Sequence, residues 1–154
     1  MSSDSITFRS AEREDLITIV RMLANDPLGA TREQFAEALP PSYSEAFVAI
    51  SADPHNELLV AEREGRVVGV LQLTLIPNLT YEGGWRAQIE GVRVAVEARG
   101  HGIGRALMDE AITKARSAGC RLVQLTTDKR RPEALKFYES VGFRATHAGM
   151  KLWL

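Results

Sequence analysis

The chain has 154 residues, enough for one hydrophobic core, and we expect a single domain over residues 1–154. Hydrophobic residues make up 45% of the chain and charged residues 25%, which excludes an intrinsically disordered protein. The formal net charge of −1 argues against general binding to nucleic acid, because such binding requires a cluster of unopposed lysine and arginine side chains.

The N-terminal third alternates between one strand pattern and several helical patterns. Residues 6–9 alternate as a short strand does, and residues 15–23 carry apolar side chains at helical spacing. Thr31 can cap a second helix, which the proline pair beginning at Pro40 then breaks. A third helix is expected over residues 42–52.

Beyond residue 55 the period changes to that of strands. We expect strands over 57–61, 67–75, 86–94 and 121–127, a loop over 77–84, helices over 102–118 and 132–141, and paired strands over 143–147 and 150–154. The resulting order, β-α-α-β-β-β-α-β-α-β-β, predicts an α/β fold. It has a mixed, mostly antiparallel central sheet of six to seven strands with helices on both faces.

Cysteine and histidine residues give no indication of a metal site. Cys120 is the only cysteine, which excludes an intrachain disulfide, and its apolar neighbours favour a buried thiol over a catalytic one. His55, His101 and His147 lie far apart without ligand spacing, so we predict no metal. No apolar run approaches the roughly 20 residues of a membrane helix, and we expect a cytoplasmic protein without a membrane partner.

The most informative segment is a strand that leads into a glycine-rich turn and then a long helix. Glycines alternate with other residues over 99–105, and Arg99 and Arg105 add positive charge. Free N–H groups at the start of a helix attract anions, and glycine lets a ligand approach the backbone closely. Such a turn suits a pyrophosphate, although glycines there can also serve chain geometry alone. The spacing matches neither the dinucleotide fingerprint nor a P-loop.

Two motifs in this chain resemble those of the GNAT superfamily of N-acetyltransferases. Residues 99–104 (RGHGIG) are similar to its Gln/Arg-x-x-Gly-x-Gly/Ala signature, and residues 134–143 (ALKFYESVGF) are similar to its Ala-x-x-Phe-Tyr-x-x-x-Gly-Phe segment. The predicted order of elements also matches across nearly the whole chain. The resemblance implies the acyl-CoA N-acyltransferase fold of a bacterial, small-molecule-type member, with acetyl-CoA as cosubstrate and often a homodimer.

By this resemblance, the amides of the turn hold the pyrophosphate of coenzyme A, and the backbone of the preceding strand binds the acetyl carbonyl and the pantetheine arm. The residues implied in coenzyme A binding are Val92, Val94, Arg99, Gly100, His101, Gly102, Ile103, Gly104, Arg105, Thr127, Arg131 and Phe137. Arg131 stands where many relatives have asparagine, which puts one pantetheine contact in doubt. It could reach a phosphate instead, or belong to a solvated basic run.

Two residues are candidates for the proton transfers. Tyr138 matches the tyrosine that many family members use as general acid, and a phenol with a pKa of about 10 can share a proton with a thiolate. Glu90 resembles the acidic residue of the spermidine/spermine-type members, whereas Gln88 stands where the histone-acetylating branch has its base. We expect Gln88, Glu90 and Val92 to share one face of their strand. A packed tyrosine and a solvated glutamate remain the alternatives.

The amine acceptor is specified least. Tyr81, Trp85, Arg86 and Gln88 are candidates for binding it, or are packing or dimer residues. We expect acetyl transfer to a primary amine of a small molecule, by direct attack in a ternary complex, because no residue suits a covalent intermediate. The alternatives are acetylation of a protein lysine or N-terminus, and a non-catalytic acyl-CoA-binding regulatory module. The sequence identifies neither the acceptor nor the length of the acyl group.

Overall fold

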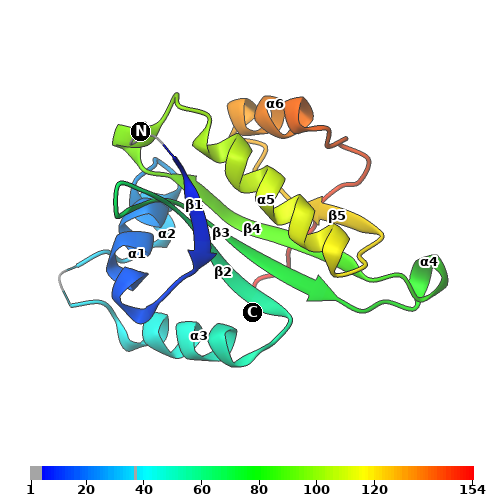
Figure 1. Cartoon of the computed structure of the whole chain (residues 1–154), viewed down its shortest axis with the longest axis horizontal. Coiled ribbons are helices and arrows are strands. Elements are labelled where there is room, and N and C mark those ends of the chain that lie inside the picture. The colour runs from blue at the N-terminus through cyan, green and yellow to red at the C-terminus, as the bar shows by residue number, and fades with distance from the viewer. Residues whose placement is uncertain (1–4, 37) are drawn as a thin grey trace. The chain divides into compact units, whose positions relative to one another are not determined.

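A computed structural model describes residues 5–36 and 38–154 (Figure 1). The chain divides into two compact units, Met1–Gln124 and Leu125–Leu154. The first unit carries the elements β1 (Thr7–Ser10), η1 (Arg13–Asp15), α1 (Leu16–Ala24), α2 (Gly29–Arg32), α3 (Pro41–Ala52), β2 (Asn56–Arg63), β3 (Arg66–Ile76), α4 (Thr80–Gly83), β4 (Arg86–Val94), η2 (Val96–Ala98) and α5 (Ile103–Ser117). Strand β5 (Leu122–Leu125) lies at the boundary, with its last residue in the second unit, which also contains α6 (Pro132–Val141).

One sheet of five strands, in the order β1-β2-β3-β4-β5, organises the fold. Strands β1 to β4 pair antiparallel. The N–H of Arg121 donates to the Trp85 carbonyl, and three residues further along both strands Gln124 lies against Gln88, so β5 runs in the same direction as β4. The predicted mixed, mostly antiparallel sheet with flanking helices is confirmed, and the described residues contain five strands instead of the expected six to seven.

Helix α5 covers the apolar face of this sheet, across which it lies in Figure 1. Leu59, Leu71 and Ile89 on the strands and Leu107 on the helix are each at most 1% exposed. Gly69 allows the close approach, because a Cβ there would lie 3.3 Å from Cγ2 of Ile103. Burial of these side chains is the main stabilising contribution in the first unit.

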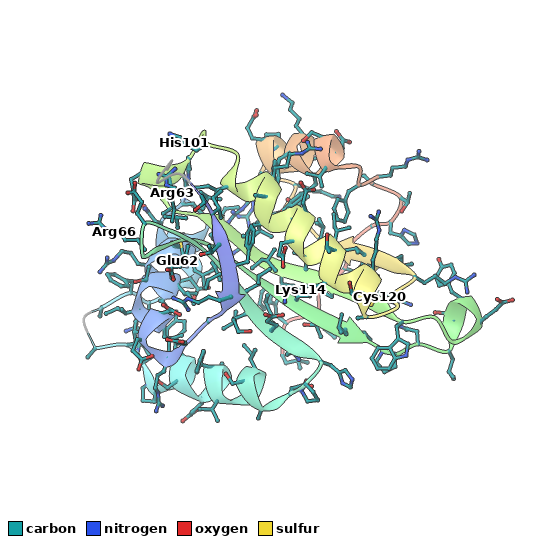
Figure 2. All side chains as sticks on the ribbon, viewed as in Figure 1. Glu62, Arg63, Arg66, His101, Lys114 and Cys120 are labelled. Atoms are coloured by element: carbon teal, nitrogen blue, oxygen red, sulfur yellow. The ribbon has the colours of Figure 1, made fainter. Side chains whose placement is uncertain are left out.

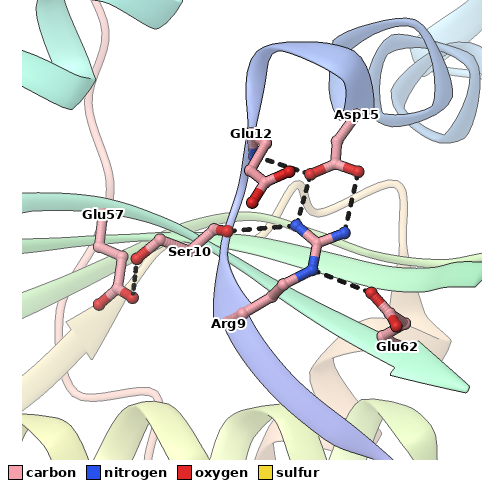
Figure 3. Close-up of polar contacts among 6 residues, drawn as sticks. All are labelled: Arg9, Ser10, Glu12, Asp15, Glu57 and Glu62. Atoms are coloured by element: carbon pink, nitrogen blue, oxygen red, sulfur yellow. Dashed lines mark hydrogen bonds and ion pairs between the residues drawn. The ribbon is translucent and has the colours of Figure 1, made fainter. Parts of the chain in front are cut away.

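The first strand is held by a cluster of charges around Arg9 (Figure 3). Its guanidinium donates from Nη1 to Oδ2 of Asp15 at 2.6 Å and from Nε to Oε2 of Glu62 at 2.9 Å. The Asp15 carboxylate also accepts the backbone N–H of Glu12 at 2.7 Å. The hydrogen bond from Arg9 holds the pKa of Asp15 below its ordinary value, so this group is ionised and joins β1, β2 and the start of α1.

The predicted second helix after Thr31 is wrong. Thr31 does not cap a helix, since its hydroxyl donates to the Leu28 carbonyl at 2.7 Å inside the single turn of α2. Glu33 is extended, and its carboxylate accepts the Tyr43 hydroxyl at 2.6 Å, while that hydroxyl accepts the Gln34 N–H at 3.0 Å. A tertiary contact with α3 therefore replaces the expected intrahelical bonds.

The two predicted C-terminal strands are also absent among the described residues 143–154. The N–H of Thr146 donates to the Arg144 carbonyl in a local turn, and Met150 and Trp153 are 93% and 84% exposed. Alternating side chains indicate two faces, but a strand also requires a partner for its backbone groups, and the sequence pattern does not supply one.

Candidate functional site

A β-bulge divides β4 into two halves. Gly91 has a φ of +62°, a conformation that favours glycine, and the pairing with β3 shifts there. Glu90 pairs with Gln72, whereas Val70 pairs with Arg93. Paired residues share a face, so Arg93 and not Val92 stands on the face of Glu90. The expected alternation through Val92 is wrong, because the bulge adds one residue to this strand.

The second half of β4 leads into the turn 99–102 and the start of α5. Gly100 and Gly102 have φ values of +82° and +75°, and no atom lies within 4 Å of a Cβ built at either residue. The first intrahelical bond is the one from Ala106 N–H to the Gly102 carbonyl at 3.0 Å, and no side chain caps α5. The N–H groups before Ala106 belong to the first turn of α5, where a helix has no carbonyl four residues earlier to accept them. Such a terminus can bind an anion.

The side chains of the turn have different surroundings. The His101 ring, labelled in Figure 2, donates from Nδ1 to the carbonyls of Arg99 at 3.0 Å and Ala98 at 3.3 Å. Arg99 donates from Nε to the Val94 carbonyl at 3.3 Å. Ile103 is 1% exposed and belongs to the core.

Polar side chains cover part of the sheet face that is turned away from α5. We call them the polar face, which consists of Asn56, Gln72, Thr74, Arg86, Gln88, Glu90 and Gln124. Arg86 donates from Nη1 to Oε1 of Gln124 at 3.2 Å, and Gln124 donates from Nε2 to Oε1 of Gln88 at 2.7 Å. Glu90 is exposed and stands beside Gln72. The structure thereby brings three of the predicted site residues, Arg86, Gln88 and Glu90, onto one surface.

The residues of β2 and β3 on the polar face were missed from the sequence. Oδ1 of Asn56 accepts Nε2 of Gln72 at 3.0 Å and the Thr74 hydroxyl at 2.7 Å, and its Nδ2 donates to Oδ2 of Asp53 at 2.7 Å. Hydrogen bonds from the His55 N–H and from Asn56 hold the pKa of Asp53 below its ordinary value. Gln72 and Thr74 alternate with leucines in an otherwise apolar strand, which is the signal that could have found them.

Two other acceptor candidates lie in different surroundings. The Trp85 ring packs against the His55 ring with the centroids 5.0 Å apart, which gives it a structural role. Tyr81 lies in the short turn α4 with a φ of +54° and is 57% exposed, and its carbonyl accepts Nη1 of Arg121 at 2.9 Å. The polar face does not depend on either ring.

The second unit holds the predicted acid. Tyr138 is half-buried in α6, with its ring centroid 5.3 Å from that of Phe137 and 6.1 Å from that of Phe143. Arg131 precedes the helix, and its N–H donates to the Asp128 carbonyl at 2.9 Å. Thr127 is half-buried after β5. These residues share one unit with each other, whereas Glu90 and the glycine turn belong to the first.

Other reactive groups offer no alternative centre. Burial raises the pKa of the half-buried Cys120 thiol, which opposes a nucleophilic role. Over residues 5–36 and 38–154, no three histidine, cysteine, aspartate or glutamate side chains group together as metal ligands would. The same part of the chain has no helix with both the length and the apolar character of a membrane span.

Comparison with known proteins gives a family match and several similar proteins. A model of the acetyltransferase (GNAT) family matches residues 22–143. An aminoalkylphosphonate N-acetyltransferase of Salmonella typhimurium is 32% identical over 69% of this chain and 68% of its own length. A glucosamine 6-phosphate N-acetyltransferase of Trypanosoma brucei brucei is 39% identical over 57% of this chain and 58% of its own length. A crystal structure described as a transcriptional regulator from Bacillus halodurans C-125 is 51% identical, with a TM-score of 0.94 over 97% of this chain and 100% of that one.

Proposed function

We propose that this chain, which belongs to the acetyltransferase (GNAT) family, transfers the acetyl group of acetyl-CoA to the primary amine of a small molecule. The observation that carries the proposal is the course of β4, whose polar row of Arg86, Gln88 and Glu90 is followed by the bulge, the end of the strand, η2 and then the glycine turn of α5. One strand can therefore present an acceptor site and a donor site in sequence. The family match runs across both compact units, which supports one catalytic domain over residues 1–154.

The turn suits the diphosphate of coenzyme A. The open space around Gly100 and Gly102 leaves room for a ligand beside the start of α5, and Arg99 and Arg105 add positive charge. The backbone of Val92 and Val94 would pair with the amide-containing arm of acetyl-CoA, as an added strand does. We assign Thr127, Arg131 and Phe137 to the same cosubstrate on the resemblance of the second motif.

The proposed reaction is a direct attack of the amine nitrogen on the thioester carbonyl. The C–N bond forms and the C–S bond breaks, so that coenzyme A leaves as a thiolate that takes a proton from Tyr138. An amine with a pKa of about 10 is largely protonated at pH 7, and exposing its lone pair costs about 4 kcal/mol. Glu90 attracts the ammonium ion and accepts the proton that leaves it before the attack. The second proton, which leaves the nitrogen as the amide forms, restores the phenol of Tyr138.

The role of Glu90 can be tested through the pH dependence of the reaction. We expect Glu90→Gln to lower kcat/KM at pH 7 by roughly 10²-fold. The loss should shrink as the pH approaches the pKa of the amine, because the free amine then forms without a base. Steady-state rates from pH 6 to pH 10 measure this, and a constant ratio of the two rates across that range would remove Glu90 from proton transfer.

The relatives suggest the chemical class of the acceptor. The Salmonella and Trypanosoma proteins are named for amines that also carry a phosphonate or a phosphate. We propose an acceptor of similar kind for this chain, with Arg86 contributing positive charge on the polar face. A protein lysine or N-terminus is the alternative acceptor.

One panel tests the function. The chain is incubated with acetyl-CoA and, in turn, polyamines, amino acids, aminoglycosides, aminophosphonates, amino sugar phosphates and peptides, and the released thiol is followed. Turnover with one small-molecule class supports the proposal. Turnover with peptides alone would favour protein acetylation. Tight binding of acetyl-CoA without any turnover would favour the regulatory module. The Bacillus halodurans relative, which is described as a transcriptional regulator, is consistent with that outcome.

A homodimer is part of the proposal. Met150, Leu152 and Trp153 are 84% or more exposed, and a row of large apolar side chains of this kind suits a contact with a second copy. Light scattering of the wild type and of Trp153→Ser measures it. An unchanged mass for both, equal to one chain, would contradict the dimer. The cytoplasmic location stays a prediction.

A further inference from the structure

One hydrogen-bond relay on the polar face begins at a group that can only donate. Arg86 donates from Nη1 to Gln124 at 3.2 Å, so the Gln124 atom that faces it must be the amide oxygen. The Gln124 NH₂ group then faces Gln88 at 2.7 Å, and the Gln88 atom that receives it must again be the oxygen. The NH₂ group of Gln88 is thereby turned out of the relay. Its orientation follows from the chemistry of Arg86.

A second relay begins at a group that can only accept. The pKa of Asp53 is lowered, so its carboxylate is ionised, and it accepts the NH₂ group of Asn56 at 2.7 Å. The Asn56 oxygen therefore faces the NH₂ group of Gln72 at 3.0 Å and the Thr74 hydroxyl at 2.7 Å. Since the Gln72 NH₂ group is used in this way, its carbonyl oxygen is turned out of the relay.

The register of β3 and β4 sets the two ends of the relays next to each other. Gln88 pairs with Thr74, and Glu90 pairs with Gln72. The polar face accordingly presents hydrogen-bond donors at Gln88 and, two residues or roughly 7 Å further along the strand, two oxygen acceptors at Gln72 and Glu90. A donor beside a pair of acceptors is complementary to a molecule with an ammonium group at one end and an oxygen acceptor near it.

The outward NH₂ group of Gln88 has no hydrogen-bond acceptor in the protein among the described residues. Gln88 is half-buried, and its donor weakens the binding of any ligand that covers it without supplying an acceptor. A ligand that supplies an oxygen there is favoured over one that supplies a methylene, for the same reason that sites built to hydrogen-bond reject analogues that lack the group.

From these orientations we propose that Gln88 is a specificity-determining residue, which selects primary amines with an oxygen acceptor a few atoms from the nitrogen. Hydroxyl, ether, carboxylate and phosphonate oxygens all meet this requirement. Arg86 and Gln124 are positioning residues that act through Gln88. The inference rests on the proposed function and names the substrate class of the same site.

Two acceptors of equal size test the selection. 2-Methoxyethylamine and butylamine differ in one position, which is an oxygen that can only accept in the first and a methylene in the second. We expect the wild type to have a kcat/KM about tenfold higher for 2-methoxyethylamine, because the transition state with this amine contains roughly one more hydrogen bond. Gln88→Leu should remove the preference, by lowering the rate with 2-methoxyethylamine and by raising the rate with butylamine, because no donor is then left without a partner.

The relay itself is tested by Gln124→Glu. A carboxylate at this position accepts from Arg86 and also accepts from Gln88, so the Gln88 amide must turn and present its oxygen to the ligand. The variant is nearly isosteric, and we expect it to lose the tenfold preference although Gln88 is still present. Arg86→Gln should weaken the preference, because Gln124 can then turn over, whereas Arg86→Lys, which retains a group that only donates, should preserve it.

Acetyl-CoA affinity serves as the control for folding, and we expect it to be unchanged in all four variants. Turnover by the wild type with equal kcat/KM for the two amines would overturn this inference and leave the proposed function standing. A preference that survives Gln124→Glu would overturn the relay. Turnover with none of the amines in the panel would overturn the proposed function, and this inference with it.

Discussion

The two faces of the central sheet carry different kinds of information. Under α5 the sheet is apolar, and Leu59, Leu71 and Ile89 are at most 1% exposed. On the polar face Arg86, Gln124 and Gln88 are half-buried and linked to one another by hydrogen bonds. Burial of apolar side chains stabilises the first face, and this contribution does not depend on the orientation of individual atoms. The hydrogen bonds on the second face require each donor to point at an acceptor. The fold therefore depends mainly on one face and the proposed chemistry mainly on the other.

The largest effect is expected under α5. Leu107 is fully buried on the side of α5 that faces the sheet, and Leu107→Ala should lower the free energy of unfolding by about 2–5 kcal/mol, through lost burial and a residual cavity. Urea unfolding measures it. Thr74→Ala on the polar face, which removes one hydrogen bond, should lower it by about 1 kcal/mol. Equal losses at the two sites would break the distinction between the faces.

The proposed acid gives the next largest effect. Tyr138→Phe removes only the hydroxyl, and we expect kcat to fall roughly 10²-fold while the affinity for acetyl-CoA stays nearly the same. Steady-state kinetics and calorimetric titration measure the two quantities. Tyr43→Phe in α3 is the matched control, because its hydroxyl bonds Glu33 and Gln34 in the first unit. An unchanged kcat for Tyr138→Phe would remove this tyrosine from the mechanism.

A smaller effect is expected at the anion-binding turn. Gly102→Glu places bulk and negative charge beside the amides of residues 103–105, and the affinity for acetyl-CoA should fall about tenfold or more. Gly119→Glu is the control, because Gly119 follows the other end of α5 with a similar φ of +81° and equally open surroundings. Equal affinities for the two variants would show that backbone strain, and not the turn, explains the change.

The smallest effect concerns the pairing of Arg9 with Asp15. The pKa of Asp15 is lowered in the folded chain, so its contribution to stability is present above its unfolded pKa of about 3.9 and is lost as the pH falls through the lower folded pKa. Asp15→Asn should cost about 1 kcal/mol at pH 7. The difference from the wild type should shrink toward pH 2. A difference that does not depend on pH would contradict an ionised Asp15.

The same division explains what could be predicted from the sequence. Apolar periodicity predicted β4, α5 and α6 to within a residue or two, and the glycines at 100 and 102 predicted an open turn. The bulge at Gly91 could not be predicted, because it depends on pairing with β3. The same holds for the relay through Gln124, since a partner distant in the chain decides which way an amide points. The missing C-terminal strands also depend on pairing rather than on pattern.

The most direct test of the account is a crystal structure of the chain with acetyl-CoA and an amine acceptor that is turned over. The account predicts the pyrophosphate on the amides of residues 103–105, the pantetheine arm along Val92–Val94, and the acceptor nitrogen beside Glu90 on the polar face. Acetyl-CoA bound elsewhere, or an acceptor held away from Gln88 and Glu90, would contradict it.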